Sequence, residues 1–95
     1  MAKIRRLVLD VVIPNTTEVI KLTQEIADLG LTEGVNSLVN EIDKNVTNIK
    51  ITLEGADISF KDVERVIKSH GGSIHSIDNV VAGKLIVEDV DTPQD

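Results

Sequence analysis

Three residue types that build nucleophilic enzyme sites lie close together in the stretch GGSIHSIDNVVAG at residues 71–83: His75, Ser76 and Asp78. A serine nucleophile needs a histidine within hydrogen-bond reach. Adjacent residues of a β-strand point to opposite faces, so His75 and Ser76 cannot pair if this stretch is a strand, whereas Ser76 and Asp78 share a face. We therefore predict no catalytic site here and interpret the three residues as candidates for ligand or interface contacts.

A second candidate site consists of carboxylates, which are the ligands that Ca²⁺ and Mg²⁺ prefer. Its members are Asp10, Glu54, Glu41 and Asp43. If the first and third predicted strands run side by side in parallel, the pairs are Arg6 with Lys50, Val8 with Thr52, and Asp10 with Glu54. Two neighbouring carboxylates repel each other unless a cation lies between them. A divalent cation is one interpretation of this surface, and a solvated or interface surface is the other.

The two histidines and the paired glycines have structural explanations. His70 lies at the predicted end of a helix, where a cation complements the helix dipole. A metal held between His70 and His75 is the alternative. Gly71 and Gly72 follow the same helix end, whereas phosphate-binding glycines precede a helix. We interpret them as a helix cap and a turn.

The composition excludes several classes of function. The 95 residues carry a formal net charge of −6, which is unsuited to nucleic acid or to an anionic membrane surface. The absence of cysteine removes disulfides and thiolate chemistry. Charges interrupt every apolar segment, so we expect a cytoplasmic protein without a signal peptide. Because Phe60 is the single aromatic residue, the core is small, and self-association would add buried area.

The hydrophobic pattern predicts the elements in order. Strands are expected at 3–12, 35–43 and 47–54, and a fourth follows Gly72. Asn15 is expected to cap the first helix, with Glu18 three positions on, and Ser59 the second. Residues 80–87 are expected to form a short extra strand after a turn at 78–79. We expect it to pair across a subunit boundary, and the alternative is that it folds back on its own sheet. The predicted domain is 1–88, followed by a disordered acidic tail at 89–95.

This order predicts an α+β fold, a ferredoxin-like βαββαβ sandwich with an antiparallel sheet and two helices on one face. Alternation assigns one set of side chains to the helices: Leu7, Leu9, Val11, Ile49, Ile51 and Leu53. The opposite set lies on the face without helices, which we call the open face. It contains Arg6, Val8, Asp10, Val12, Lys50, Thr52 and Glu54.

Three segments together resemble the domain of unknown function 211 family, an uncharacterised and largely archaeal group. They are KIRRLVLDVVIP, GVNSLVNEIDKNVTNIKITLEG and GGSIHSIDNVVAGKLIVE, which cover most of the chain. The resemblance implies the ferredoxin-like fold and symmetric homo-oligomers, but no established activity. The resemblance implies a bulky aliphatic residue at position 37 in most members of the family, and often another at position 73. This chain differs at both positions, with Ser37 and Ser73. The residues inside matching motifs are Asp10, Glu41, Asp43, Glu54, His75 and Asp78.

Two functions remain after these exclusions. An RNA-recognition sheet would need aromatic residues and positive charge, and a heavy-metal carrier of this fold would need cysteines. The first hypothesis is a non-enzymatic homo-oligomer whose partner is itself, with a role in binding a small molecule or in regulation. The alternative is a protein that binds Ca²⁺ or Mg²⁺, or a metal-dependent enzyme, through the open-face carboxylates.

Overall fold

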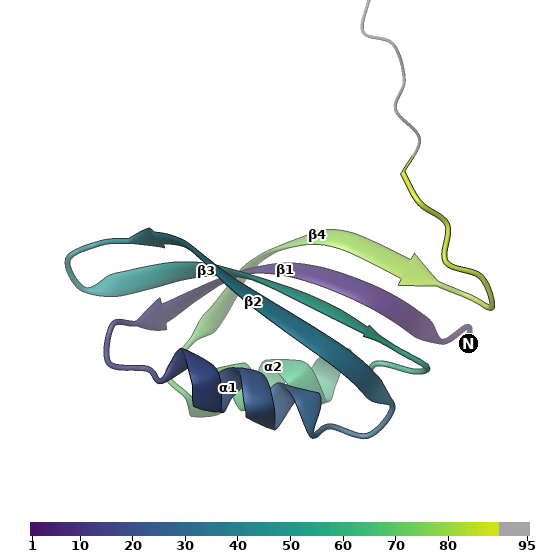
Figure 1. The fold of residues 1–95 in the computed structure, drawn as a ribbon, viewed down its shortest axis with the longest axis horizontal. Helices are drawn as coiled ribbons and strands as arrows, with labels where there is room; N and C mark the ends of the chain where they lie inside the picture. The colour runs from purple at the N-terminus through teal and green to yellow at the C-terminus, as the bar shows by residue number, and fades with distance from the viewer. Residues whose placement is uncertain (90–95) are drawn as a thin grey trace, which may run out of the picture.

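One four-stranded sheet and two helices make up the computed structural model, which describes residues 1–89 (Figure 1). The elements in chain order are β1 (Ile4–Pro14), α1 (Val19–Ala27), β2 (Thr32–Ile42), β3 (Val46–Gly55), α2 (Phe60–Ser69) and β4 (Ser73–Ala82). The strands lie in the order β2-β3-β1-β4, and every neighbouring pair is antiparallel. Both helices lie on the same side of the sheet, as Figure 1 shows. The fold is therefore the predicted ferredoxin-like α+β fold.

The core lies between the two central strands and the helices. Alternate residues of β1 and β3 are fully buried there, as the sequence pattern predicts. The helices close this layer with Leu22, Ile26, Val63 and Ile67. The predicted facing of β1 and β3 is confirmed, because all six helix-facing residues are buried. The side chains between them are left on the open face.

The two central strands are antiparallel, so the parallel register expected from the sequence is wrong. Arg6 lies opposite Glu54, Val8 opposite Thr52, and Asp10 opposite Lys50. In this topology the β1-α1-β2 crossover makes β1 parallel to β2, and β3 returns between them through a hairpin. Relative to the expected parallel register, the direction of β3 is reversed, so Lys50 and Glu54 exchange partners. Val8 and Thr52 stay paired because they are the middle pair of the three.

Helix α1 begins without the predicted capping box. Glu18 is the residue at the N-cap, and it makes no side-chain capping bond. Asn15 instead belongs to a turn, in which Thr17 N donates to Pro14 O. The Asn15 amide donates to the carbonyls of Asp43 and Lys44. Asn15 therefore joins the end of β1 to the β2–β3 hairpin, a contact that local helix signals do not reveal.

Helix α2 has the start and end that its sequence predicts. Ser59 Oγ accepts a hydrogen bond from Asp62 N, which satisfies one of the free amides at the helix start. At the other end, Gly72 N donates to Ile67 O and Gly71 N donates to Lys68 O. Together with the left-handed φ of +82° at Gly71, these bonds form a Schellman motif.

Helix α1 and strand β2 meet through a polar contact. Ser37 lies opposite the buried Ile51, so its side chain faces the helices. Its hydroxyl lies 2.7 Å from Thr23 Oγ1, and Thr23 donates its own proton to Val19 O. Ser37 is therefore the donor to Thr23. This hydrogen bond joins α1 to β2.

Strand β4 is longer than predicted and contains two bulges. It continues to Ala82, so residues 80–82 belong to it, and residues 78–79 form no turn. His75 and Asp78 are the extra residues where the register with β1 shifts. Lys84–Asp89 form no strand, so the described part of the chain contains no fifth strand. Apart from Asp89, the predicted tail at 89–95 lies outside the described residues.

None of the helices within residues 1–89 is long and apolar enough to span a membrane.

Candidate functional site

The open face carries charges that alternate in sign along its two central strands. Arg6 and Asp10 on β1 face Glu54 and Lys50 on β3, so each charge lies opposite one of the other sign. The sequence placed the correct residues on this face, but the wrong register predicted that like charges would meet. The geometric basis for a cation between Asp10 and Glu54 is therefore lost. Asp10 lies opposite Lys50, which is four positions from Glu54 on β3, so Asp10 and Glu54 are about 14 Å apart along the strands.

Arg6 is the most connected side chain on this face. Its Nε donates to Glu54 Oε2 at 2.8 Å. Its two terminal nitrogens donate to the two oxygens of Glu88, at 3.0 and 2.8 Å. This is the two-bond geometry in which guanidinium groups hold carboxylates. The hydrogen bonds from Arg6 lower the pKa of Glu88 below its ordinary value, and Glu88 and Glu54 raise the pKa of Arg6.

A second polar group surrounds Asp78 on β4. Ser76 Oγ donates to Asp78 Oδ1 at 2.7 Å, so the predicted sharing of a face by these two residues is confirmed. Lys50 Nζ lies 3.8 Å from Asp78 Oδ2. The bulge at Asp78 changes the direction of the strand locally, which is how bulges aim side chains toward a site. Asp78 thus belongs to the open-face charge pattern.

A hollow of about 520 Å³ lies between these two groups. Side chains of β1, β3 and β4 line it, and Glu88 and Asp89 of the C-terminal segment border it. Asn79 also lines the hollow, and its Oδ1 is buried without a hydrogen-bond partner. Buried polar atoms are nearly always paired, so an acceptor of this kind marks a position for a donor.

The other candidates from the sequence lie elsewhere. Asp10 accepts a bond from Asn48 Nδ2 at 2.6 Å. Glu41 lies opposite Asn48, and Asp43 lies in the turn that follows β2. These three carboxylates therefore lie toward the hairpin end of the sheet, away from Glu54. Residues 1–89 contain no group of three or more His, Asp or Glu side chains arranged to hold a metal ion.

The histidines do not come together with the serines. His75 is exposed at its bulge. His70 Nε2 lies 2.7 Å from Glu25 Oε2 on α1, so His70 connects the two helices. This contact adds to the predicted position of His70 at the end of α2, where it is the C-cap residue.

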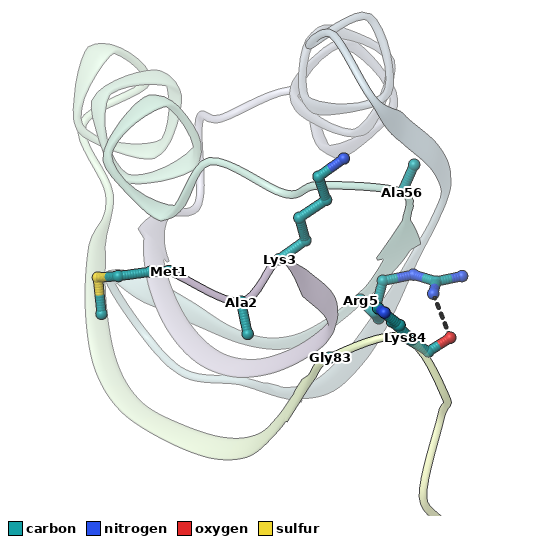
Figure 2. A pocket seen from close by; sticks show the side chains of 7 residues that line it. All are labelled: Met1, Ala2, Lys3, Arg5, Ala56, Gly83 and Lys84. Atoms are coloured by element: carbon teal, nitrogen blue, oxygen red, sulfur yellow. Dashed lines mark hydrogen bonds between the residues drawn. The ribbon is translucent and has the colours of Figure 1, made fainter.

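A second hollow, of about 560 Å³, lies beside the start of β1 (Figure 2). Arg5 borders it and donates from Nε to Gly55 O and from a terminal nitrogen to Lys84 O. The register of β1 with β4 shifts between Ile4 and Arg6, which makes Arg5 the extra residue of a bulge in β1. Arg5 and Arg6 both connect the end of β3 to the C-terminal segment, Arg5 through backbone carbonyls and Arg6 through carboxylates.

Sequence reasoning did not single out Arg6, Lys50, Asn79 or Glu88 as site residues. Arg6 and Lys50 were placed on the open face, and a search for unlike charges four positions apart within each central strand would have found them. Asn79 was interpreted as a turn residue. Glu88 was assigned to the very end of the domain, and no sequence signal connects it to Arg6, which lies 82 positions away.

Comparisons with known proteins agree with the resemblance seen in the sequence. The model of the DUF211 family, described as "Uncharacterized ArCR", matches residues 5–95. The chain is 46% identical to "Uncharacterized protein MJ0319" of Methanocaldococcus jannaschii, over all of this chain and 98% of that protein. Both descriptions leave the function open. This chain belongs to the archaeal DUF211 family.

Proposed function

We propose that the protein is a non-enzymatic homo-oligomer of the cytoplasm, in which copies associate through the C-terminal segment 84–89 and the edges of the sheet. The open face, in this proposal, serves as a small-ligand or regulatory surface. The C-terminal segment carries the proposal, because the single chain leaves its apolar side chains Leu85 and Val87 largely exposed. The second copy is the partner to which the proposal commits.

The exposure along this segment has the period of a strand. Leu85 is 76% exposed, Ile86 38% and Val87 71%. Figure 1 shows the segment leaving the sheet beyond the end of β4. Two outward apolar side chains with a more covered one between them suit an extended segment that adds to another sheet. Covering an aliphatic side chain of this size contributes about 1.5–3 kcal/mol.

The same chain offers edges that could accept such a segment. β2 and β4 are the outer strands, of 11 and 10 residues, and each leaves one row of backbone groups without a strand partner. Exposed apolar side chains accompany both edges: Leu38 and Ile42 on β2, and Ile77 and Val80 on β4. The segment 84–89 of one copy could therefore pair with β2 or β4 of a second copy. Because every copy carries both the segment and the edges, this pairing supports self-association.

The contacts of the reactive residue types support a non-enzymatic role. The Ser76 hydroxyl is bonded to Asp78, and the His70 ring to Glu25. His75 has an exposed side chain on β4. Neither contact joins a serine to a histidine, which is the pair that a serine nucleophile needs.

Sedimentation velocity at micromolar concentration tests the proposal. The full chain should sediment as an oligomer, and Leu85→Ser with Val87→Ser should shift it to smaller species while leaving the circular dichroism spectrum unchanged. These changes keep Glu88 and its contact with Arg6. Ile20→Ser is the matched control, because Ile20 is 77% exposed and lies on α1, outside the segment 84–89. A full chain that is monomeric, or a double variant that keeps the full assembly size, would contradict the proposal.

A further inference from the structure

We infer that the open-face hollow binds a small molecule carrying both a carboxylate and a protonated amine, and that Glu88 occupies the carboxylate position as an internal competitor. The inference rests on the proposed ligand-binding role of the open face and names the chemistry of the ligand. It has three parts: an arginine prepared for a carboxylate, an unpaired acceptor prepared for a donor, and a charge balance that favours a zwitterion.

Arg6 is held in position for a second carboxylate. Glu54 binds its Nε, which fixes the guanidinium plane and leaves the two terminal nitrogens directed to one side. Glu88 takes these two nitrogens with both of its oxygens. The Arg6 side chain is 19% exposed and that of Glu88 is 68% exposed. The Arg6 side chain is thus held in place by the sheet, whereas the Glu88 carboxylate is exposed and can be replaced by the carboxylate of a ligand.

Within residues 1–89, the hydrogen bonds of the Glu88 side chain both go to Arg6. The described residues after Gly83 form no strand. The start of the segment is fixed by Gly83 N donating to Lys3 O and by Arg5 donating to Lys84 O. A ligand carboxylate with the same two-bond geometry can therefore replace Glu88 without disturbing the sheet.

Asn79 supplies the second recognition group. Its Oδ1 is buried, lacks a partner and lines the same hollow. An unpaired buried acceptor costs free energy that a donor would recover. Asn79 lies opposite Val8, which is two residues along β1 from Arg6 and on the same face, so the backbone positions of Arg6 and Asn79 are about 7 Å apart along the strand direction.

The charges around the hollow determine whether a carboxylate ligand with a net negative charge or one without net charge binds better. With the C-terminal segment in place, Glu54, Asp78, Glu88 and Asp89 line the hollow with only Arg6 and Lys50 to oppose them. When Glu88 and Asp89 leave, two carboxylates and two cations remain. A balanced site accepts a molecule without net charge better than an anion, which favours a carboxylate joined to an amine. The amine is then placed at Asn79 and Asp78.

Isothermal titration calorimetry of the full chain with three probes tests each part. L-alanine carries both groups, acetate only the carboxylate, and methylamine only the amine. We expect alanine to bind with higher affinity than acetate, and methylamine to give no binding heat over the same concentration range. Glu88→Gln should tighten alanine binding about tenfold, because it removes the competitor that restricts the open site to a minor population.

Two variants control for charge and fold. Glu33→Gln removes one carboxylate from an exposed position on β2 and should leave alanine binding unchanged. Arg6→Lys keeps the charge but loses the two-bond geometry, and it should abolish alanine binding with an unchanged circular dichroism spectrum. Retained alanine binding in folded Arg6→Lys would overturn the site.

Three further outcomes would overturn parts of the inference. Absence of alanine binding in both wild type and Glu88→Gln rejects the ligand class. Equal affinities of these two proteins reject Glu88 as a competitor. Equal affinities for acetate and alanine reject the amine position. Sedimentation of the same samples measures self-association separately, so loss of assembly with intact alanine binding contradicts the proposed oligomer and not the site.

Discussion

Arg6 of β1 lies directly opposite Glu54 of β3, and the Arg6 Nε is 2.8 Å from Glu54 Oε2. This pairing defines the register of the two central strands and reverses the charge pattern that a parallel arrangement would give. It also fixes the guanidinium that receives Glu88 from the C-terminal segment. One strand register thus determines both the electrostatics of the open face and the position of the guanidinium that Glu88 contacts.

Cysteine pairs should report the register directly, because the chain has no cysteine of its own. Asp10→Cys with Lys50→Cys should form an intramolecular disulfide on mild oxidation, since opposite residues of antiparallel strands lie within disulfide range. Asp10→Cys with Glu54→Cys is the control and should stay reduced. Non-reducing gels at low protein concentration measure the outcome, and efficient cross-linking of the control pair alone would contradict the antiparallel register.

The C-terminal segment should detach from Arg6 in acid. The hydrogen bonds from Arg6 place the pKa of Glu88 below its ordinary value of 4.5. Because the pKa is lowered in the folded state, the contact is complete above pH 4.5 and is lost as the pH falls through the lowered value. The amide resonances of residues 85–87 should change over this range.

Glu88→Gln serves as the control for this titration, because an amide does not ionise. Its segment resonances should already resemble those of the acid form at neutral pH and should lack this transition. A transition of the same size in Glu88→Gln would assign the pH response to a different carboxylate.

The hydroxyl pair between α1 and β2 should show coupling. Thr23→Val removes the acceptor of Ser37 and should destabilise the protein by about 1 kcal/mol, because it leaves a half-buried hydroxyl without its partner. Adding Ser37→Val should recover part of this loss, since two apolar side chains then meet. Urea unfolding of the two single variants and the double variant measures the coupling, and strictly additive effects would show that the hydroxyls do not interact energetically.

The end of α2 should depend on the glycine at position 71. Gly71→Ala should cost about 1 kcal/mol, because its φ of +82° suits glycine and an added Cβ would lie 3.2 Å from Pro14 Cγ. Gly30→Ala is the matched control, because a Cβ there has no heavy atom within 4 Å. Thermal unfolding should separate the two variants, and equal melting temperatures would contradict a special role for Gly71.

The amino-acid sequence alone determined the features that depend on neighbouring residues. Alternation in β1 and β3 identified the buried residues, because side chains of a strand alternate between its faces. Ser59 and Gly71 marked the limits of α2, because capping uses amides and carbonyls within one turn of the helix. The order of the elements and the spacing of the apolar residues were then sufficient to predict the ferredoxin-like fold.

Tertiary structure decided the features that depend on distant partners. The direction of β3 against β1, and with it the neighbour of Asp10, follows from how the crossovers pack on the sheet. Asn15 has the side chain of a helix cap, but the hairpin carbonyls 28 and 29 positions away compete for it. Asp78 and Asn79 are residue types that favour turns, but both belong to β4, which pairs with the long strand β1. Asp78 is the extra residue of a bulge there. The candidate site lies where such distant contacts meet, so it could not be predicted from the sequence. A hydrogen bond between Arg6 and Glu88 leaves no pattern in the residues between them.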